Sequence, residues 1–492
     1  MPHAKIYLDY AATTSVDRKV LRAMQPYFGA KFGNAGSLHS FGQETIAALD
    51  ASRETIAKAI NADFREIIFT GSATEANNLA LRGALSGIMN NELRMAGRGN
   101  GGVGNSFIHH SPFIIPKIIV SAIEHESVLE TARDMEKEGA EVVVISVDKR
   151  GLIDMKKLRA AIDERTVLVS VMYANNEIGT VEPISEISKY LRDFRSTKSE
   201  ARNTKQIQNP NFKDSRRFNP DIVSDFGFRY SDFGTAYPLF HVDAVQAFQF
   251  LDCNADALGV DLMTLSAHKI YGPKGVGALY VRGARKNHES RIMNNGQSDS
   301  SIIHHSPFIL PIITGGGQEF GLRSGTENIP SIVGFARAVE LVSARRKREN
   351  ERIWALGRYY IDELKKIYPK LEVNGIENIG LDSRLRGNDK TTPRLPNILN
   401  VHIPGARAEE LLTRWDIAGL AASAGSACSA RSYEPSHVIK ALGYPGARAK
   451  ESVRFSFGAP TTKEEVDKAL RIIENAKISA KGGSASGGKV TI

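Results

Sequence analysis

The chain alternates short apolar runs with longer amphipathic stretches. The short runs have the length of buried strands, and they fall at residues 66–69, 117–121, 141–145, 167–173, 240–243, 261–265 and 276–281. Apolar residues at helical spacing predict helices between and after them, with clear examples at 17–27, 44–60 and 329–352. Strands that alternate with helices predict an α/β fold with a mostly parallel sheet and helices on both of its faces.

Four regions interrupt this alternation, and they are rich in Asn, Gly, Ser and Arg: residues 87–115, 196–238, 284–312 and 378–394. Two of them share a near-repeat, at 108–116 and 303–311. We interpret the four regions as insertions that leave the fold as surface loops. The paired histidines of the repeat lack a third and a fourth ligand nearby, which disfavours a metal site.

Composition narrows the class of protein. With 492 residues, 42% hydrophobic and 24% charged, the chain has the make-up of a soluble globular protein. No apolar run is long enough to span a membrane, and the N-terminus has no signal-peptide pattern. Two cysteines far apart give no disulfide framework, so a reducing, cytoplasmic compartment is expected. The net charge of +9 is scattered along the chain, and no nucleic-acid partner is expected.

A lysine stands directly after one of the predicted strands. Lys269 follows the run 261–265 in a tight turn that also holds Ser266 and His268. Partial burial lowers the pKa of a lysine and makes its amine a nucleophile for a carbonyl, most often that of pyridoxal 5'-phosphate (PLP). A single lysine in such a turn is more often a solvated surface residue, so this interpretation depends on its companions.

The companions supply what a PLP site requires. Asp243 ends a predicted strand and could pair with the pyridinium nitrogen, and Thr74 lies in a small-residue turn at a helix start that suits a phosphate or an ordinary N-cap. His125 follows a strand, and Arg454 lies within one and could bind a substrate carboxylate. Several of these residues are expected at the carboxyl ends of parallel strands, where open sheets bind ligands.

Together these motifs resemble the cysteine desulfurases, PLP-dependent class-V enzymes of fold type I. The matching residues are 7–14, 73–75, 124–125, 175–179, 241–246, 266–275, 323–326, 426–429 and 453–456. The resemblance runs from about residue 6 to 473. It implies a large PLP-binding domain at 15–325 with a seven-stranded type of sheet. It also implies a smaller α+β domain formed by 1–14 and 326–477, and residues 478–492 read as a flexible tail.

The resemblance also implies roles for individual residues. Lys269 would hold PLP and then move a proton, and His125 would stack on the ring and assist proton transfer. The expected cofactor-binding residues are Ala73, Thr74, Asn176, Asp243, Gln246, Ser266, His268, Lys269 and Thr326. Thr326 would come from the partner subunit of a homodimer, whereas Arg454 and Asn176 would bind L-cysteine.

Cys428 lies in an Ala/Ser/Gly-rich stretch and would be the catalytic nucleophile. It would take the substrate sulfur as a persulfide, leave L-alanine, and pass the sulfur to an acceptor such as an iron–sulfur scaffold protein. No resident metal is expected, beyond a transient contact of Cys428 with a cluster on a partner. Cys253 matches no motif and is expected to be structural. Ala35–Gly36 and Gly71–Ser72 depart from the usual pattern but keep small residues.

Other functions remain open from the sequence. A different class-V reaction, such as that of an aminotransferase or a selenocysteine lyase, would use the same PLP site, although an aminotransferase has no use for Cys428. A catalytically silent scaffold for cluster assembly is a third reading. The sequence does not identify the sulfur acceptor.

Overall fold

The computed structural model describes residues 5–96, 115–207, 237–283, 309–376, 394–425 and 435–482, without the side chains of 90–96, 198–207 and 478–482. Its centre is a seven-stranded sheet in the order β2-β8-β7-β6-β5-β3-β4. The strands are β2 (Ile67–Thr70), β3 (Lys117–Ser121), β4 (Glu141–Ile145), β5 (Thr166–Ser170), β6 (Leu239–Asp243), β7 (Leu262–Ser266) and β8 (Gly277–Val281). Only β8 runs antiparallel to its neighbours within this sheet. The predicted fold class is confirmed.

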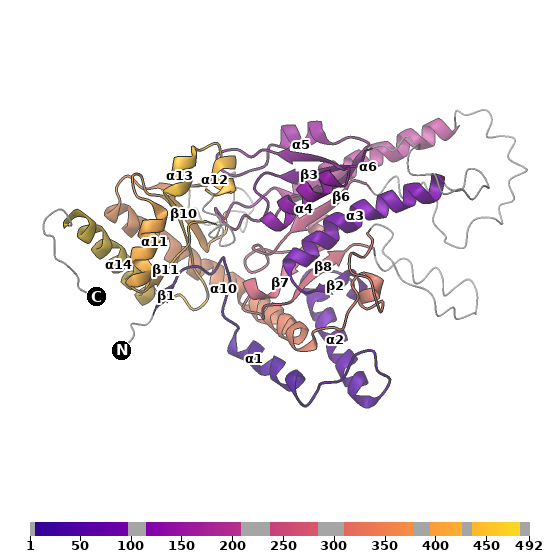
Figure 1. Cartoon of the computed structure of the whole chain (residues 1–492), viewed down its shortest axis with the longest axis horizontal. Coiled ribbons are helices and arrows are strands. Elements are labelled where there is room, and N and C mark those ends of the chain that lie inside the picture. Colours follow the sequence, from indigo (N-terminus) through magenta and orange to yellow (C-terminus); the bar gives the residue numbers. More distant parts are fainter. Residues whose placement is uncertain are drawn as a thin grey trace, which may run out of the picture.

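Helices cover both faces of this sheet (Figure 1). Successive side chains of a strand point to opposite faces, and the core divides accordingly: Ile68 packs with α3 (Ala73–Ala96) and α4 (Glu126–Lys137). Ile67 packs on the other face with the helices α2 (Ser40–Ala59), α6 (Ile184–Ile207) and α10 (Ile329–Ile367). Both faces of the inner strands are therefore buried, which explains their continuous apolar runs.

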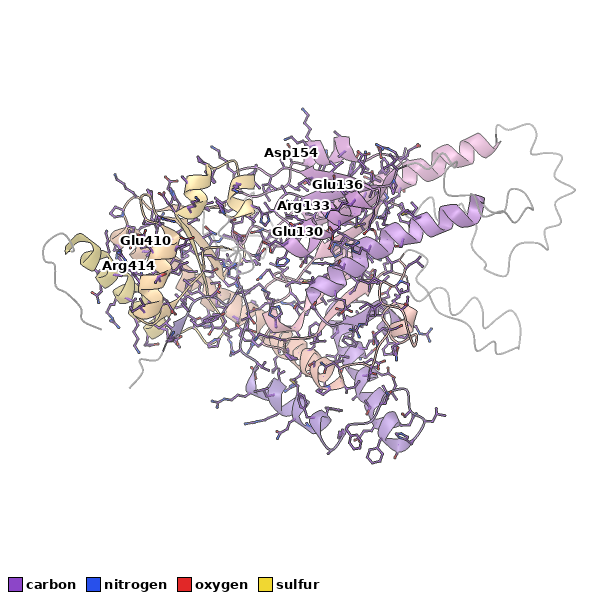
Figure 2. The ribbon with its side chains drawn as sticks, viewed as in Figure 1. Glu130, Arg133, Glu136, Asp154, Glu410 and Arg414 are labelled. Atoms are coloured by element: carbon purple, nitrogen blue, oxygen red, sulfur yellow. The ribbon has the colours of Figure 1, made fainter. Side chains whose placement is uncertain are left out.

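The helix α4 shows how the amphipathic pattern places these helices. Val128 and Met135 are buried against the sheet. Glu130, Arg133 and Glu136 lie on its opposite, exposed side, where Figure 2 labels them. One stripe of the helix thus buries apolar area while the other remains solvated.

A smaller group of elements follows α10. A three-stranded antiparallel sheet joins β9 (Glu372–Val373), β10 (Ile398–His402) and β12 (Ser452–Ser456), and β1 (Ile6–Tyr7) pairs with β11 (Leu420–Ala421). The helices here are α11 (Ala408–Ile417), α12 (His437–Ala441), α13 (Gly446–Lys450) and α14 (Lys463–Gly482). The N-terminal strand therefore lies among C-terminal elements (Figure 1). The domain boundaries stay a prediction.

Some element boundaries differ from the predicted ones. The first helix α1 covers Arg18–Met24 and continues as a 3₁₀ turn with Pro26, and α2 begins at Ser40 because His39 caps it through Gly42 N–H. The strand β4 is the sheet edge and not fully buried, since Val144 is 55% exposed. The helix α10 runs to residue 367, further than predicted.

The insertions are shorter than the sequence indicated. The helices α3 and α6 continue to residues 96 and 207, beyond the expected breaks at 87 and 196. Ile309 is fully buried, and Leu310 N–H donates to Gly83 O at 3.0 Å, so the third region rejoins the fold before 312. Buried Arg394 likewise belongs to the fold. The histidine pairs of the repeat lie outside the described residues.

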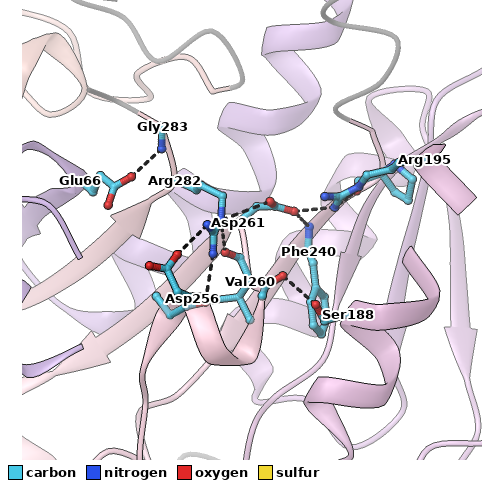
Figure 3. Close-up of polar contacts among 12 residues, drawn as sticks. Glu66, Ser188, Arg195, Phe240, Asp256, Val260, Asp261, Arg282 and Gly283 are labelled. Carbon is cyan, nitrogen blue, oxygen red and sulfur yellow. Dashed lines mark hydrogen bonds and ion pairs between the residues drawn. The ribbon is translucent and has the colours of Figure 1, made fainter. Parts of the chain in front are cut away.

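A polar network ties the sheet together at the end opposite to the carboxyl ends of β6 and β7 (Figure 3). Asp261 Oδ2 accepts from Arg195 Nη2 at 2.6 Å and from Phe240 N–H at 2.8 Å, joining α6, β6 and β7. Arg282 and Gly283, at the end of β8, bind Asp256 and Glu66. Among the described residues no helix is long and apolar enough to cross a membrane.

Candidate active site

Three of the predicted site residues lie at the carboxyl ends of parallel strands of the sheet. Asp243 is the last residue of β6, Lys269 ends a 3₁₀ turn that follows β7, and His125 caps α4 just after β3. Parallel strands end at one edge of a sheet, so these side chains converge there. Both Asp243 and Lys269 act electrostatically on the pKa of His125, consistent with this proximity. This edge is the candidate active site.

The carboxylate of Asp243 is held in place from two sides. Its Oδ2 accepts from Asn77 Nδ2 at 2.9 Å, and its Oδ1 accepts from Val245 N–H at 3.0 Å. The side chain of Asp243 is only 5% exposed. Asn77 Nδ2 also lies 2.8 Å from Ser127 Oγ, which links the carboxylate to the first turn of α4. An anion fixed in this way is suited to hold a protonated ring nitrogen.

The N-terminal turn lies directly against Lys269. Lys269 Nζ donates to Ala11 O at 2.6 Å and to Ala12 O at 2.7 Å. Gln246 Nε2 donates to the same Ala11 carbonyl at 2.9 Å. Lys269 and Gln246 therefore lie close together, because both donate to the carbonyl of Ala11. That residue is more than two hundred positions away from either of them in sequence.

The ring of His125 is held as a neutral imidazole. Burial lowers the pKa of His125 most, while Asp243 raises it and Lys269 lowers it further. Ser127 N–H donates to His125 Nδ1 at 3.1 Å, so the neutral ring carries its proton on Nε2. A flat, neutral imidazole is suited to stack on another ring and to take part in proton transfer.

His268 is also uncharged at neutral pH. Burial, with Lys269 and Lys274 adding to it, lowers the pKa of His268 to about 4. Its Nδ1 lies 3.1 Å from Thr13 Oγ1, and its carbonyl accepts from Thr14 Oγ1 at 2.9 Å. Tyr271 N–H donates to Thr14 Oγ1 at 2.8 Å, so the turn is hydrogen-bonded to the N-terminal segment before and after Lys269.

The turn before α3 has the geometry of an anion site. Ser72 Oγ accepts from Glu75 N–H, but the main-chain N–H groups of Ala73 and Thr74 find no acceptor among the described residues. Thr74 is exposed at this helix start. Gly277, the register partner of Ser266, lies so close that a Cβ there would be 2.9 Å from Ala73 N. Ser266, at the end of β7, therefore lies near the free N–H groups of Ala73 and Thr74, which can bind a phosphate.

Arg454 is buried in β12 with part of its guanidinium unpaired. Its Nη1 donates to Asn176 O at 2.9 Å, and its Nη2 donates to Asp9 Oδ1 at 2.7 Å. Arg454 is 1% exposed, and its Nε has no partner within the described part of the chain. An unpaired guanidinium N–H in a buried position is suited to receive a carboxylate. The predicted pair of Arg454 and Asn176 is indeed adjacent.

The described structure of a single chain does not bring two of the predicted residues, Thr326 and Cys428, into this cluster. Thr326 is exposed, and its loop is fastened to the start of α3 by Arg323, whose Nε lies 2.7 Å from Glu75 Oε1. Cys428 lies outside the described residues. Its neighbours before and after, Gly425 and Ser436, are described.

Sequence reasoning missed several residues that shape the site. Asn77 and Asp9 hold Asp243 and Arg454, and the carbonyls of Ala11 and Ala12 receive Lys269. All of these residues lie inside or beside the recognised motifs. Their partners, however, are set by packing between distant segments. Asn77, for example, is buried one helical turn after Ala73, where α3 packs on the sheet.

A separate cavity of about 210 Å³ lies between α4 and the strands β3 and β4. Its lining includes Leu129, Val142 and His437, and none of the predicted site residues. His437 Nε2 lies 3.0 Å from Glu124 O, so the cavity borders the turn that precedes His125. It does not form part of the site at the carboxyl ends of the strands.

Comparison with known proteins decides the family. The aminotransferase class-V model matches residues 6–92, 110–197 and 235–469. The chain belongs to the class-V aminotransferase family. It is 37% identical over 470 residues to the cysteine desulfurase IscS of Dictyoglomus turgidum, covering 96% of this chain and 94% of that one. The cysteine desulfurase IscS of Clostridium botulinum strain Hall is 34% identical, with 95% and 93% covered.

Solved structures agree with this membership. A NifS-like protein has a TM-score of 0.69 and 28% identity, covering 96% of this chain and all of its own. The NifS-like protein of Rickettsia africae has a TM-score of 0.66 and 27% identity, with 96% and 99% covered. The resemblance to the cysteine desulfurases is confirmed, and the chain is an enzyme of this PLP-dependent family.

Proposed function

We propose that the protein removes sulfur from L-cysteine, releases L-alanine, and carries the sulfur as a persulfide on Cys428. One observation carries the proposal. Asp243, Lys269 and His125 meet at one sheet edge, and the strand of Arg454 is hydrogen-bonded to Ser423, a few residues before Cys428. This arrangement supports the proposal because the strand of Arg454 is joined to the part of the described chain that leads towards Cys428 in sequence.

The residues present fit PLP. Asp243 would pair with the ring nitrogen, Lys269 would bind the aldehyde carbon, and His125 would lie against the ring face. The free N–H groups of Ala73 and Thr74 are the right donors for a phosphate. The remaining phosphate and ring contacts would come from Ser266, His268, Asn176, Gln246 and Thr326 of the partner subunit. When bound, PLP withdraws electrons from the bonds at the substrate Cα.

The substrate would be oriented by Arg454. Its unpaired Nε–H faces no protein acceptor among the described residues, and a carboxylate supplies one. Asn176, whose carbonyl already contacts Arg454, lies beside the same position. The amine of Lys269, once released, would take the proton from the substrate Cα.

Sulfur transfer would follow at Cys428. Its thiolate would attack the substrate sulfur, forming a sulfur–sulfur bond while the carbon–sulfur bond breaks and its electron pair stays with the carbon. Two proton transfers complete alanine: the imidazolium that has taken the thiol proton would protonate that carbon, and Lys269 would return its proton to the substrate Cα. His125 is suited to accept the thiol proton beforehand because burial keeps its ring neutral. The sulfur would then pass to an acceptor such as an iron–sulfur scaffold protein.

A homodimer is part of the proposal. Four apolar side chains between α1 and the first turn of α2 are exposed, namely Phe28, Phe32, Leu38 and Phe41. The rings of Phe32 and Phe41 lie 5.4 Å apart, so these two side chains form one apolar surface. A second copy that covers this surface would bury apolar area and could present the exposed Thr326 to its partner's site. We further propose a cytoplasmic enzyme with no nucleic-acid or membrane partner.

The test is alanine production from L-cysteine with added PLP and a reductant. The wild type should release alanine and sulfide, and Cys428→Ala should release neither above background. Transamination that survives in Cys428→Ala, with no desulfuration by the wild type, would instead indicate an aminotransferase. The control variant Cys253→Ala should behave as the wild type, because Cys253 is buried and burial raises its pKa to about 12.

A further inference from the structure

Glu177 is a fully buried carboxyl that contacts the chain on both sides of the Cys428 segment. It follows β5 in the bend that also holds Asn176. Its Oε2 accepts from Ser436 Oγ–H at 2.6 Å, and Ser436 is the second residue after the segment 426–434. Its Oε1 has no partner within the described residues. The carboxyl thus directs its one side-chain hydrogen bond to the exit of that segment.

The entry of the segment packs on the same oxygen. A Cβ at Gly425 would lie 2.7 Å from Glu177 Oε2, closer than real Cβ contacts come, and Gly425 has a φ of +122°. Glycine is therefore required at this position by both its neighbour and its backbone conformation. One carboxylate oxygen contacts Gly425 at the entry and Ser436 at the exit.

The residues around Glu177 are also joined to the proposed substrate-binding arginine. Asn176 O accepts from Arg454 Nη1, and Glu177 O accepts from Asn400 Nδ2 at 3.1 Å. On the entry side, Ser423 N–H donates to Arg454 O at 3.1 Å, and Arg454 N–H donates to Ser423 O at 2.7 Å. Before the segment, Ser423 is hydrogen-bonded directly to Arg454. After it, Ser436 is connected to Arg454 through Glu177 and the neighbouring Asn176.

A carboxyl is an unusual choice for this position. Burial raises the pKa of Glu177, whereas the Ser436 hydroxyl, His437 and Arg454 act in the opposite direction. A buried carboxyl with one unpaired oxygen costs more free energy than a neutral side chain of similar volume. Such a group requires an explanation beyond capping α12, since Ser436 Oγ already accepts from Ile439 N–H at 3.2 Å.

We propose that Glu177 is a positioning residue for sulfur transfer, holding the two ends of the Cys428 segment in fixed relation to Arg454. The inference rests on the proposed function, because it assigns Cys428 the attack on the substrate sulfur. A displacement of about 1 Å between nucleophile and substrate slows a reaction by roughly 10²-fold. Glu177 therefore acts on the sulfur step and not on the proton transfer at the substrate Cα.

The test compares two steps in the same PLP-loaded variants. The first is persulfide formation on Cys428 in a single turnover with L-cysteine, and the second is exchange of the Cα proton of L-alanine in deuterated water, which needs no thiol. In Glu177→Ala we expect persulfide formation to slow by about 10- to 100-fold with exchange unchanged. Glu177→Gln keeps an oxygen for Ser436 and should restore persulfide formation to near the wild-type rate.

Two further variants separate positioning from helix capping. Ser436→Asp keeps an N-cap acceptor for Ile439 but removes the donor to Glu177, so it should slow persulfide formation at least as much as Ser436→Ala. Glu182→Ala removes another buried carboxyl, which accepts from Ile153 N–H and not from Ser436, and should leave the ratio of the two rates unchanged. In the PLP-free protein, the rate at which Cys428 is alkylated should change by about threefold or more in Glu177→Ala. The same rate should be unchanged in Glu182→Ala.

The outcomes distinguish the inference from the proposed function. If the wild type forms no persulfide on Cys428, the proposed function fails. If the wild type forms it and Glu177→Ala forms it at the same rate, Glu177 has no positioning role. Equal losses of exchange and persulfide formation in Glu177→Ala would indicate a general structural defect and would also overturn the inference.

Discussion

The carboxylate of Asp9 lies 2.7 Å from the guanidinium of Arg454, although 445 residues separate them in sequence. The pair joins the N-terminal segment to β12, beside the bridge between Asp9 and Ser456. Since the next residues of that segment supply the carbonyls around Lys269, one short stretch contacts both ends of the site. Arg454 is thereby charge-balanced before any substrate carboxylate arrives.

Removing Asp9 should destabilise the fold. Asp9→Ala leaves Arg454, which is 1% exposed, with one charge-assisted hydrogen bond fewer, and such bonds contribute about 1.5–3 kcal/mol. We expect the urea midpoint to fall accordingly, and Asp9→Asn to fall less because its amide oxygen still accepts. Lys5→Ala, which breaks an exposed pair with Asp416, is the control and should change the midpoint little. Equal midpoints for Asp9→Ala and Lys5→Ala would contradict the expectation.

The support that Asn77 gives to Asp243 should appear in catalysis. Asp243→Asn should keep PLP bound but lower alanine production by about 10²-fold or more, because the ring nitrogen loses its anion. Asn77→Ala should lower it by about tenfold, in keeping with the loss of one hydrogen bond to a charged group. Asn78→Ala is the matched control, since Asn78 donates to Thr74 O and not to Asp243. Identical rates for Asn77→Ala and Asn78→Ala would show that Asn77 does not support Asp243.

The sequence was informative where a property is local. Strand ends, the turn around Lys269 and the helix start at Ala73 follow from hydrophobic pattern and turn residues, and the structure has them where they were expected. Contacts such as Asn77 with Asp243, 166 residues apart, depend on how helices pack on the sheet and leave no local signal. The end of α6 lies in a predicted insertion because residues 196–207 are mostly polar and their apolar residues lack helical spacing.

Glu182 should make stability fall as the pH rises. Burial raises the pKa of Glu182 to about 8, so between pH 4.5 and 8 the native state holds a proton that the unfolded state has lost. The native state then binds more protons, and its unfolding free energy falls with pH by up to about 1.4 kcal/mol per unit. Glu182→Gln, which keeps an oxygen for Ile153 N–H, should flatten this decline in urea denaturation from pH 5 to 8. An unchanged slope would mean that Glu182 is ionised in the native state.

The exposed apolar cluster should control assembly. Phe32→Asp introduces a charge where we place the dimer interface, so light scattering after gel filtration should show a shift from dimer to monomer. PLP should then bind more weakly, because the site would lose Thr326 of the partner subunit. Ile417→Asp, which changes a residue 83% exposed on α11, is the control and should remain dimeric. A dimeric Phe32→Asp protein would place the interface elsewhere.

Peptide mass spectrometry tests the central claim most directly. The PLP-loaded wild type is mixed with L-cysteine without reductant, quenched, and digested. The peptide containing Cys428 should carry one additional sulfur atom, and the peptide containing buried Cys253 should be unmodified. Alanine and sulfide released with no added sulfur on Cys428 would contradict the account.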